Sequence, residues 1–228
     1  MLTGKTLLNR TLIRPTTPLL NRTRHRRLHT TPHPAMRLPY VPDPPPTSSP
    51  EEERIVAAVR ARRSPRPLQP LDLALLHSPP LADGWNSFLG AVRTRCSLSQ
   101  DVRELAICRV AVVNRAWYEW GHHAPLAVEG GVPRELMEGV KTGEPLGFDG
   151  DGEGQGGFTD KQWAVLVYTD EMTRNVEVRD ETFERLKGLF SEREVVEITA
   201  TVAAYNCVSR FLVALDGELS LVFIRLGR

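Results

Sequence analysis

The chain has 228 residues, of which 41% are hydrophobic and 7% aromatic, enough to bury the core of one domain and leave a tail. This composition excludes a wholly disordered chain, a collagen-like fibre and a disulfide-stabilised scaffold. The cysteines are odd in number and have no close spacing, which predicts reduced thiols in a non-oxidising compartment; they are Cys96, Cys108 and Cys207. The net charge of +1, from 29 basic and 28 acidic residues, is unevenly distributed.

Residues 1–35 differ in composition from the rest of the chain. They hold seven of the basic residues and eight threonines but no aspartate or glutamate. Leu8 and Leu12 share one helical face, and Arg10 and Arg14 share another. Arginine-rich, hydroxyl-rich, acid-free and amphipathic leaders are typical of mitochondrial transit peptides. A disordered leader, or a start at Met36 that leaves a cytoplasmic protein, would fit the same residues.

From Met36 onward the chain has a net charge of about −6, because all 28 acidic residues but only 22 basic residues remain. It has no basic surplus for binding nucleic acid, so we expect no such partner. The longest apolar stretch, residues 198–214, is interrupted by Asn206 and Arg210, so no membrane-spanning segment is expected.

Helical patterns dominate the body of the chain. After a proline-rich arm over 36–50, Ser49–Glu52 combine a cap, a first-turn proline and a glutamate three residues after the cap, which predicts a helix to about Arg63. Capping and apolar spacing predict further helices over 71–76, 81–95, about 98–113, 116–129, 159–172 and 191–215. Residues 142–158 hold seven glycines and predict a flexible loop, and only 219–224 could be extended. We therefore expect an all-α domain over residues 51–228.

A short internal similarity hints at a duplication. A shift of 93 residues places Val102–Leu105 over Val195–Ile198 and Ala111 over Ala204. If the similarity reflects a repeat, two helical hairpins would pack about a pseudo-twofold axis.

Two carboxylates and an imidazole carry the chemistry that the sequence offers. Glu119 and His123 are four residues apart, so on a helix they share one face and can share a proton or an anionic ligand. Glu104 lies among apolar residues of the preceding helix, where a carboxylate must be paired or have a raised pKa. The plainer interpretation is a surface Glu119–His123 pair and a structural Glu104.

At these residues the chain resembles the carboxymuconolactone decarboxylase family, which includes the alkylhydroperoxidase D-like proteins. The resemblance rests on Arg103–Ile107 followed by Tyr118–His123. Further segments resemble a fungal branch of that family; these are Leu76–Pro79, Gly84–Asn86 and Tyr205–Leu212. The resemblance implies an all-helical alkylhydroperoxidase D-like bundle that assembles as trimers or hexamers, with a site on the hairpin that carries these motifs. Trp117 and Trp120 would then pack inside the subunit or between subunits.

The resemblance also separates two mechanisms. Redox members have a glutamate, then a Cys-x-x-Cys pair beginning twelve residues later, then a histidine four residues after the second cysteine. Here the glutamate and histidine match Glu104 and His123, but the cysteine positions hold Ala116 and Glu119. A disulfide route needs an attacking thiolate and a resolving thiol. The pattern therefore resembles the non-redox branch, whose named member decarboxylates a lactone acid without metal or organic cofactor.

We expect a cofactor-free lyase that acts on a small lactone or carboxylic acid, in which His123 exchanges the proton, Glu119 orients it and Glu104 tunes it. The substrate carboxylate would be held by one or more of four candidates, His77, Arg109, Arg115 and His122. An isomerase, a dehydratase or a ring-opening lyase would use the same groups. An alkylhydroperoxidase- or peroxiredoxin-like antioxidant protein and a catalytically silent oligomeric binding protein are further hypotheses consistent with the resemblance.

No metal is expected. Residues 149–160 resemble a calcium loop, but position eight is a glycine and position twelve is aspartate in place of the usual glutamate. His122 and His123 are adjacent, so on a helix they point about 100° apart and would not readily share a metal ion.

The leader generates a testable prediction. Residues 1–35 fused to a fluorescent reporter should direct it to mitochondria. A diffuse cytoplasmic signal from that fusion would contradict the prediction, and replacing the seven basic residues by glutamine supplies the control.

Overall fold

The computed structural model describes residues 37–147 and 155–215. The leader, the segment 219–224 and part of the glycine-rich loop with its calcium-like pattern lie outside these residues. Within them every regular element is helical: α1 (Pro50–Arg63), α2 (Pro70–Leu75), α3 (Pro79–Thr94), α4 (Gln100–Val113), α5 (Trp117–Glu129), α6 (Leu136–Val140), η1 (Gln155–Gly157), α7 (Asp160–Asn175), α8 (Asp180–Leu189) and α9 (Glu192–Leu215). The predicted all-α class is confirmed.

Capping chemistry sets several of the helix starts. The Ser49 hydroxyl accepts a hydrogen bond from the Glu52 backbone N–H, and Pro50 occupies the first turn of α1. Thr159 and Gln162 form a reciprocal capping box at the start of α7. These local signals depend on residues within one turn, which is why the sequence predicts them.

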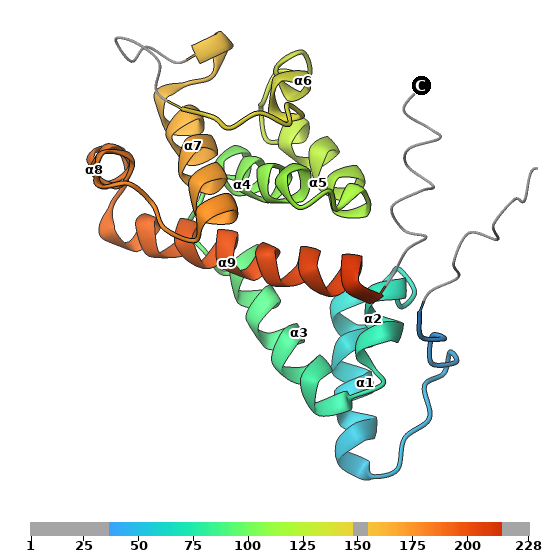
Figure 1. The fold of residues 1–228 in the computed structure, drawn as a ribbon. Coiled ribbons are helices and arrows are strands. Elements are labelled where there is room, and N and C mark those ends of the chain that lie inside the picture. The colour runs from blue at the N-terminus through green and yellow to red at the C-terminus, as the bar shows by residue number, and fades with distance from the viewer. Residues whose placement is uncertain (1–36, 148–154, 216–228) are drawn as a thin grey trace, which may run out of the picture. The chain divides into compact units, whose positions relative to one another are not determined.

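Helix α4 is the centre of the fold. It packs against α5, α7 and α9, and ten of its fourteen residues are buried. One apolar cluster lies between α4, α3, α7, α8 and α9, and a second lies between α4, α5, α6 and α7. In Figure 1, α9 runs between the group α1–α3 and the group α4–α7. A charged residue between positions 104 and 112 of α4 is therefore surrounded by protein.

Helix α9 is long and apolar enough to cross a membrane by length and composition alone. Core helices of globular domains have the same character, and nine side chains of α9 are buried against its neighbours. The helix also bears on the internal similarity: the α4–α5 turn lies at Asn114–Ala116, whereas Cys207, 93 residues beyond Asn114, lies within continuous α9. The similarity thus covers one helix and no hairpin.

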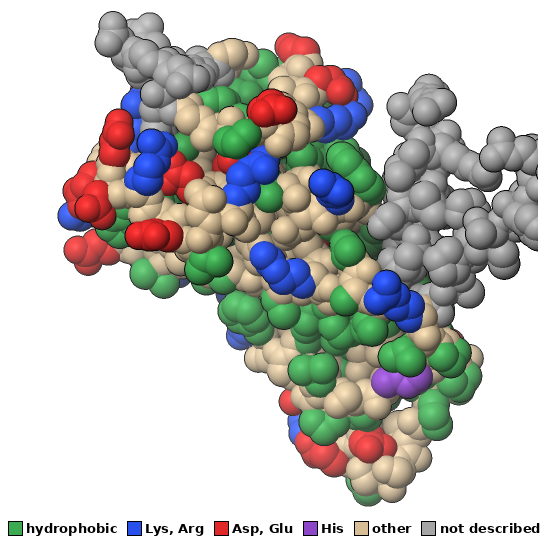
Figure 2. All heavy atoms as spheres, in the orientation of Figure 1, with side chains coloured by type: hydrophobic (Ala, Val, Ile, Leu, Met, Phe, Trp, Pro, Cys, Tyr) green, Lys and Arg blue, Asp and Glu red, His purple; other side chains and the backbone are tan. Residues whose placement is uncertain are grey.

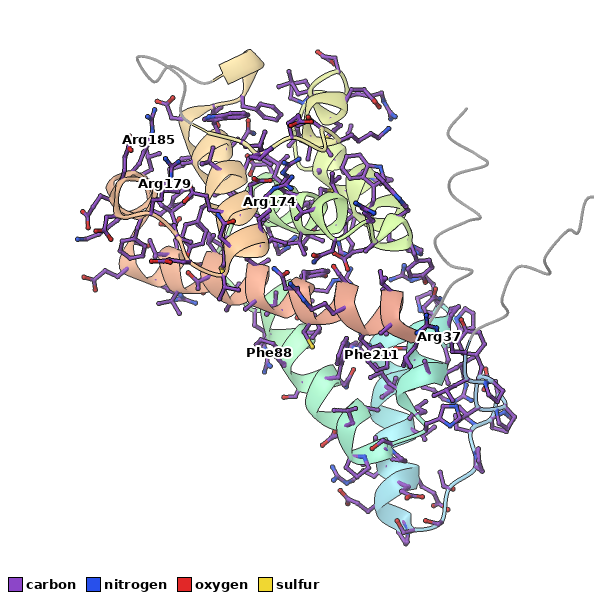
Figure 3. The ribbon with its side chains drawn as sticks, viewed as in Figure 1. Arg37, Phe88, Arg174, Arg179, Arg185 and Phe211 are labelled. Carbon is purple, nitrogen blue, oxygen red and sulfur yellow. The ribbon has the colours of Figure 1, made fainter. Side chains whose placement is uncertain are left out.

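Arg109 fixes the segment after α6 to the core. Its side chain is fully buried and donates hydrogen bonds to Asp170 on α7. It also donates to the carbonyl oxygens of Val140, Thr142 and Glu144 at 2.7–2.9 Å. Arg174, labelled in Figure 3, donates to the second Asp170 oxygen from a more exposed position. All three side-chain nitrogen atoms of Arg109 thus donate hydrogen bonds within the protein.

Replacing Arg109 should destabilise the fold strongly. Arg109→Leu would leave Asp170 and three carbonyl groups without their main donor, so we expect the free energy of unfolding to fall by about 3–5 kcal/mol. Arg174→Gln removes a partly exposed partner of the same carboxylate and should cost about 1 kcal/mol or less. Urea denaturation measures both; equal losses would contradict the assignment of Arg109 as the anchor.

Candidate active site

The α4–α5 hairpin brings Glu104 and His123 into direct contact. The distance from His123 Nδ1 to Glu104 Oε2 is 2.6 Å, and both side chains are buried. Arg103 Nε donates to the other Glu104 oxygen at 3.1 Å. The His123 ring also meets the Tyr205 ring of α9 edge to face, with 5.0 Å between centroids. Two helices and an aromatic wall therefore fix the orientation of the imidazole.

The protonation states of this pair follow from its surroundings. Burial lowers the pKa of His123, and the opposing effect of Glu104 does not overcome it. Burial acts to raise the pKa of Glu104, but hydrogen bonds and charges from His123 and Arg103 outweigh it and lower that pKa overall. Near neutral pH the pair is therefore a carboxylate and a neutral imidazole. Nδ1–H then donates to Glu104, and Nε2, which has no hydrogen-bond partner among the described residues, carries the basic lone pair.

Glu119 lies one turn before His123 but makes a different contact. The Ser209 hydroxyl of α9 lies 3.1 Å from both Glu119 carboxyl oxygens and 2.8 Å from the Tyr205 carbonyl oxygen. Burial raises the pKa of Glu119 well above its ordinary value. A hydroxyl has one proton for two acceptors, and a neutral Glu119 resolves this: it donates to Ser209, which donates to the carbonyl. Glu119 is thus a buried acid.

The contacts differ from the expected roles of the two glutamates. The sequence predicts that Glu119 orients His123, whereas the structure gives that contact to Glu104. The physical reason is the position of α5, which lies beside α4 and also reaches α9. His123 meets α4, and Glu119 meets α9. A spacing of four residues places two side chains on the same side of a helix but does not decide which neighbouring helix each one contacts.

A cavity of about 160 Å³ adjoins both groups. Glu119 and His123 line it together with eight apolar or aromatic residues and six polar or basic ones. The former are Leu71, Trp85, Leu89, Tyr118, Leu126, Tyr205, Val208 and Leu212; the latter are Arg62, Arg63, Arg66, Gln69, Arg93 and His122. A cavity of about 150 Å³ accommodates a benzene ring. The space therefore suits a small ring-sized group placed against one base and one acid.

Arginines surround a second, wider cavity of about 810 Å³ that shares several lining residues with the first. Its arginines come from α1 and the segment after it, from α3 with its C-terminal flank, and from α4; they are Arg62, Arg63, Arg66, Arg93, Arg95 and Arg103. No motif in the sequence singles out the first five. Their positions in separate stretches of a net-acidic body give no local signal, and only the packing of α1 against α3 brings them together.

The four predicted substrate-binding residues are dispersed. His122 lines the smaller cavity, and its Nδ1 is 2.8 Å from the Tyr118 carbonyl oxygen. His77 is exposed, with Nε2 2.6 Å from the Pro39 carbonyl oxygen, and lines neither cavity. Arg115 forms the turn between α4 and α5 with a positive φ of 58°. Neither Arg115 nor the buried Arg109 lines the two cavities.

The positions of the cysteines do not favour a thiol site at either cavity. Cys108 is fully buried, and burial raises the pKa of its thiol well above the ordinary value. Cys207 is exposed on α9, Cys96 is half-buried, and none of the three lines either cavity. In the described part of the chain no three His, Cys, Asp or Glu side chains are grouped so as to hold a metal ion.

Comparison with known proteins agrees with the fold. Residues 79–142 match the model of the Carboxymuconolactone decarboxylase family, a region that includes Glu104, Glu119 and His123. A search of curated proteins finds no match. The family match is confined to that region, and the solved structures below share the fold of most of the chain.

Several solved structures share the fold at low sequence identity. An uncharacterized peroxidase-related protein from Ralstonia eutropha, described as an alkylhydroperoxidase AhpD core, has a TM-score of 0.58 and 18% identity, covering 83% of this chain and 96% of its own. An uncharacterized peroxidase-related protein from Silicibacter sp. has a TM-score of 0.60 and 16% identity, covering 82% and 93%. The debrominase Bmp8 has a TM-score of 0.58 and 14% identity, covering 77% and 91%.

The buried acid predicts a specific pH dependence of stability. The pKa of Glu119 is raised in the folded state, so the unfolded chain releases this proton first as pH rises above about 4.5, which weakens the folded state. Glu119→Gln keeps the shape and a donor for Ser209 but has no such proton. The stability of the variant relative to the parent should therefore increase with pH, by at most about 1.4 kcal/mol per unit.

Urea unfolding at pH 5 and pH 8 tests this. The relevant quantity is the difference between the two proteins, because the contributions of Glu104 and His123 are largely common to both. A difference that is constant over this range would mean that Glu119 is already ionised in the folded state.

Proposed function

We propose that this protein is a cofactor-free proton-transfer enzyme, a lyase similar to carboxymuconolactone decarboxylase that acts on a small lactone or carboxylic acid. The observation that carries the proposal is the placement at one cavity of His123, hydrogen-bonded to Glu104, and of the buried Glu119, where burial lowers the pKa of the imidazole and raises that of the carboxyl group. Environments that push neighbouring pKa values apart in this way provide a base and an acid at the same pH.

The proposed chemistry uses both groups. Decarboxylation breaks the bond between carbon and the carboxylate, releases carbon dioxide and leaves an electron pair that an adjoining carbonyl accepts as an enolate. Glu119 donates a hydrogen bond, and then its proton, to the developing anion. His123, oriented by Glu104, is the base that takes a proton from solvent and returns it to Glu119 for the next turnover. The product differs from the substrate by carbon dioxide lost and one proton gained. In an isomerisation or a dehydration, His123 Nε2 would remove a proton from the substrate itself.

A thiol mechanism is the second candidate, because two of the structures that share the fold are peroxidase-related proteins by name. In this chain the thiol nearest to the dyad in sequence, Cys108, is fully buried with a raised pKa, which opposes the formation of a thiolate. The exposed Cys207 does not line either cavity. These features favour proton transfer over peroxide reduction.

Replacing the proposed acid–base groups should reduce turnover without unfolding the protein. We expect His123→Gln, Glu104→Gln and Glu119→Gln each to lower kcat by roughly 10² to 10⁴, the usual range for such groups. The assay is release of carbon dioxide from carboxymuconolactone, with a parallel assay of tert-butyl hydroperoxide reduction in the presence of dithiothreitol. Circular dichroism checks that each variant is folded.

Cys108→Ala and Cys207→Ser are the matched controls and should retain turnover, apart from any packing loss at the buried site. Loss of peroxide reduction in a cysteine variant together with its retention in His123→Gln would replace the proposal with a thiol mechanism. Turnover in neither assay would favour a catalytically silent binding protein.

We also propose that the protein acts in mitochondria, on the composition of residues 1–35, and that it belongs to a fungal branch of the family, on the segments named above.

We further propose that the protein is a homotrimer or hexamer. Support for assembly comes from apolar side chains at the surface. Phe88 is 48% exposed, Leu81 52% and Val196 66%. Figure 2 shows hydrophobic side chains gathered where α3 meets α9, and Figure 3 labels Phe88 on α3 and Phe211 on α9. Trp117 and Trp120 are only partly exposed.

Light scattering at micromolar concentration should report a trimer or a hexamer, because assembly would cover these apolar side chains. Phe88→Glu should shift the distribution toward monomer, whereas Glu184→Gln, on the exposed face of α8, should not. A parent protein that is monomeric would contradict the assembly proposal.

A further inference from the structure

Two of the arginines at the wider cavity lack the partners that the others have. Arg63 binds both carboxyl oxygens of buried Asp72, at 2.7 and 2.8 Å, and Arg62 adds a contact to the same carboxylate at 3.2 Å. Arg95 donates to the Ser87 carbonyl oxygen and Arg103 to Glu104. By contrast, the side chains of Arg66 and Arg93 have no hydrogen-bond or ion-pair partner in the described ranges 37–147 and 155–215.

Arg66 and Arg93 line both cavities, so they lie where the two cavities adjoin. Arg93 is half-buried, and its charge adds to the lowering of the His123 pKa, of which burial is the main cause. Arg66 follows α1; its backbone N–H donates to the Arg63 carbonyl oxygen at 2.9 Å, and the Arg63 side chain binds Asp72. Two guanidinium groups without partners between the two cavities are suited to bind a planar or tetrahedral oxyanion.

The distribution of charged residues also favours anion binding at the wider cavity. The body carries about −6 overall, yet the wider cavity is lined by six arginines against Asp83, Glu104 and Glu129. Residue 66 also lies outside the region 79–142 that matches the family model, so this arginine belongs to the part of the chain that the family match does not cover. The positive charge at this cavity is therefore a local feature, built where α1 packs against α3.

We propose that Arg66 and Arg93 are specificity-determining residues that bind the oxyanion of an organic acid, a carboxylate or a phosphate, while its ring-sized end enters the small cavity beside His123 and Glu119. This inference rests on the proposed function and specifies its ligand class. The anion stays at the wide, solvent-connected side, and the apolar end replaces water in the cavity. Arg66 and Arg93 thus select the ligand and position it, and the proton transfer belongs to the other groups.

Binding of simple probes tests the proposal without knowledge of the substrate. The probes are benzoate, phenyl phosphate and benzamide, the last being a neutral molecule of nearly the same shape as benzoate, measured by NMR titration of the full chain at low salt. We expect the two anions to bind at least about tenfold more tightly than benzamide, and added salt to weaken them. Whichever anion binds more tightly identifies the carboxylate or the phosphate as the preferred group.

Variants locate the binding site. Arg66→Gln and Arg93→Gln should each weaken binding of the preferred anion about tenfold or more, whereas Arg134→Gln, an exposed arginine that lines neither cavity, should leave it unchanged. Circular dichroism establishes that each variant is folded. Benzamide binding as tightly as benzoate, or Arg93→Gln binding the anions like the parent, would overturn the inference.

The same titration separates this inference from the proposed function. His123→Gln should keep the preference for benzoate over benzamide, even where it abolishes turnover, because both probes place the same ring beside residue 123 and only benzoate offers an anion to Arg66 and Arg93. Absence of turnover with intact, arginine-dependent anion binding would reject the proposed reaction and keep the anion site. Normal turnover together with equal binding of benzoate and benzamide would keep the proposed reaction and reject the anion site.

Discussion

A carboxylate buried on the central helix is the constraint on which the site depends. Glu104 lies on α4, whose neighbours cover it on several sides, so its charge needs compensation within the protein. His123 supplies that compensation from α5, and Arg103 contributes a second donor. The interaction that makes the buried charge tolerable also fixes the tautomer of the imidazole. One hydrogen bond therefore both joins α4 to α5 at this point and orients the base.

Helix α5 contacts two neighbours with different chemistry. On one side His123 meets an ionised carboxylate, and on the other Glu119 meets a hydroxyl of α9. Neither Ser209 nor the Tyr205 carbonyl offers a positive charge, so burial controls the pKa of Glu119 and keeps its proton. The pKa values of the two glutamates thus shift in opposite directions, because only Glu104 has cationic and imidazole partners.

Local features of the sequence predict most of the fold. Caps at Ser49 and Thr159 act within one helical turn, so reading a few residues is enough to place α1 and α7. The short amphipathic helix α8 is not predicted, although Leu186 and Phe190 are spaced as a helical face, because ten residues give a weak periodic signal. The candidate site is predicted less completely. Its contacts join residues far apart in sequence, 90 positions in the case of Glu119 and Ser209.

Two arginines show why the local sequence does not identify the residues that can bind a ligand. Arg109 stands beside the family-like motif and is therefore a natural candidate for binding a carboxylate, but its side chain is occupied by Asp170 and three carbonyl groups. Arg66 lies in a segment without any motif, and only the packing of the α1–α3 group places it at a cavity. Burial and existing partners decide whether an arginine can bind a ligand, and neither is a property of the local sequence.

The position of Glu119 connects the resemblance to the chemistry. In the redox proteins that the motif resembles, this position is the second cysteine of the pair, and the first corresponds to buried Ala116. A thiol and a neutral carboxylic acid are both weak acids, but only the thiol can form a disulfide and pass on electrons. With the carboxylic acid in place of the thiol, the cavity keeps a group that can give up a proton and has no partner for a disulfide. The Glu104–His123 hydrogen bond involves neither position 116 nor position 119, so this chain has a base oriented by a carboxylate, which serves proton transfer whether the neighbouring acid is sulfur or oxygen.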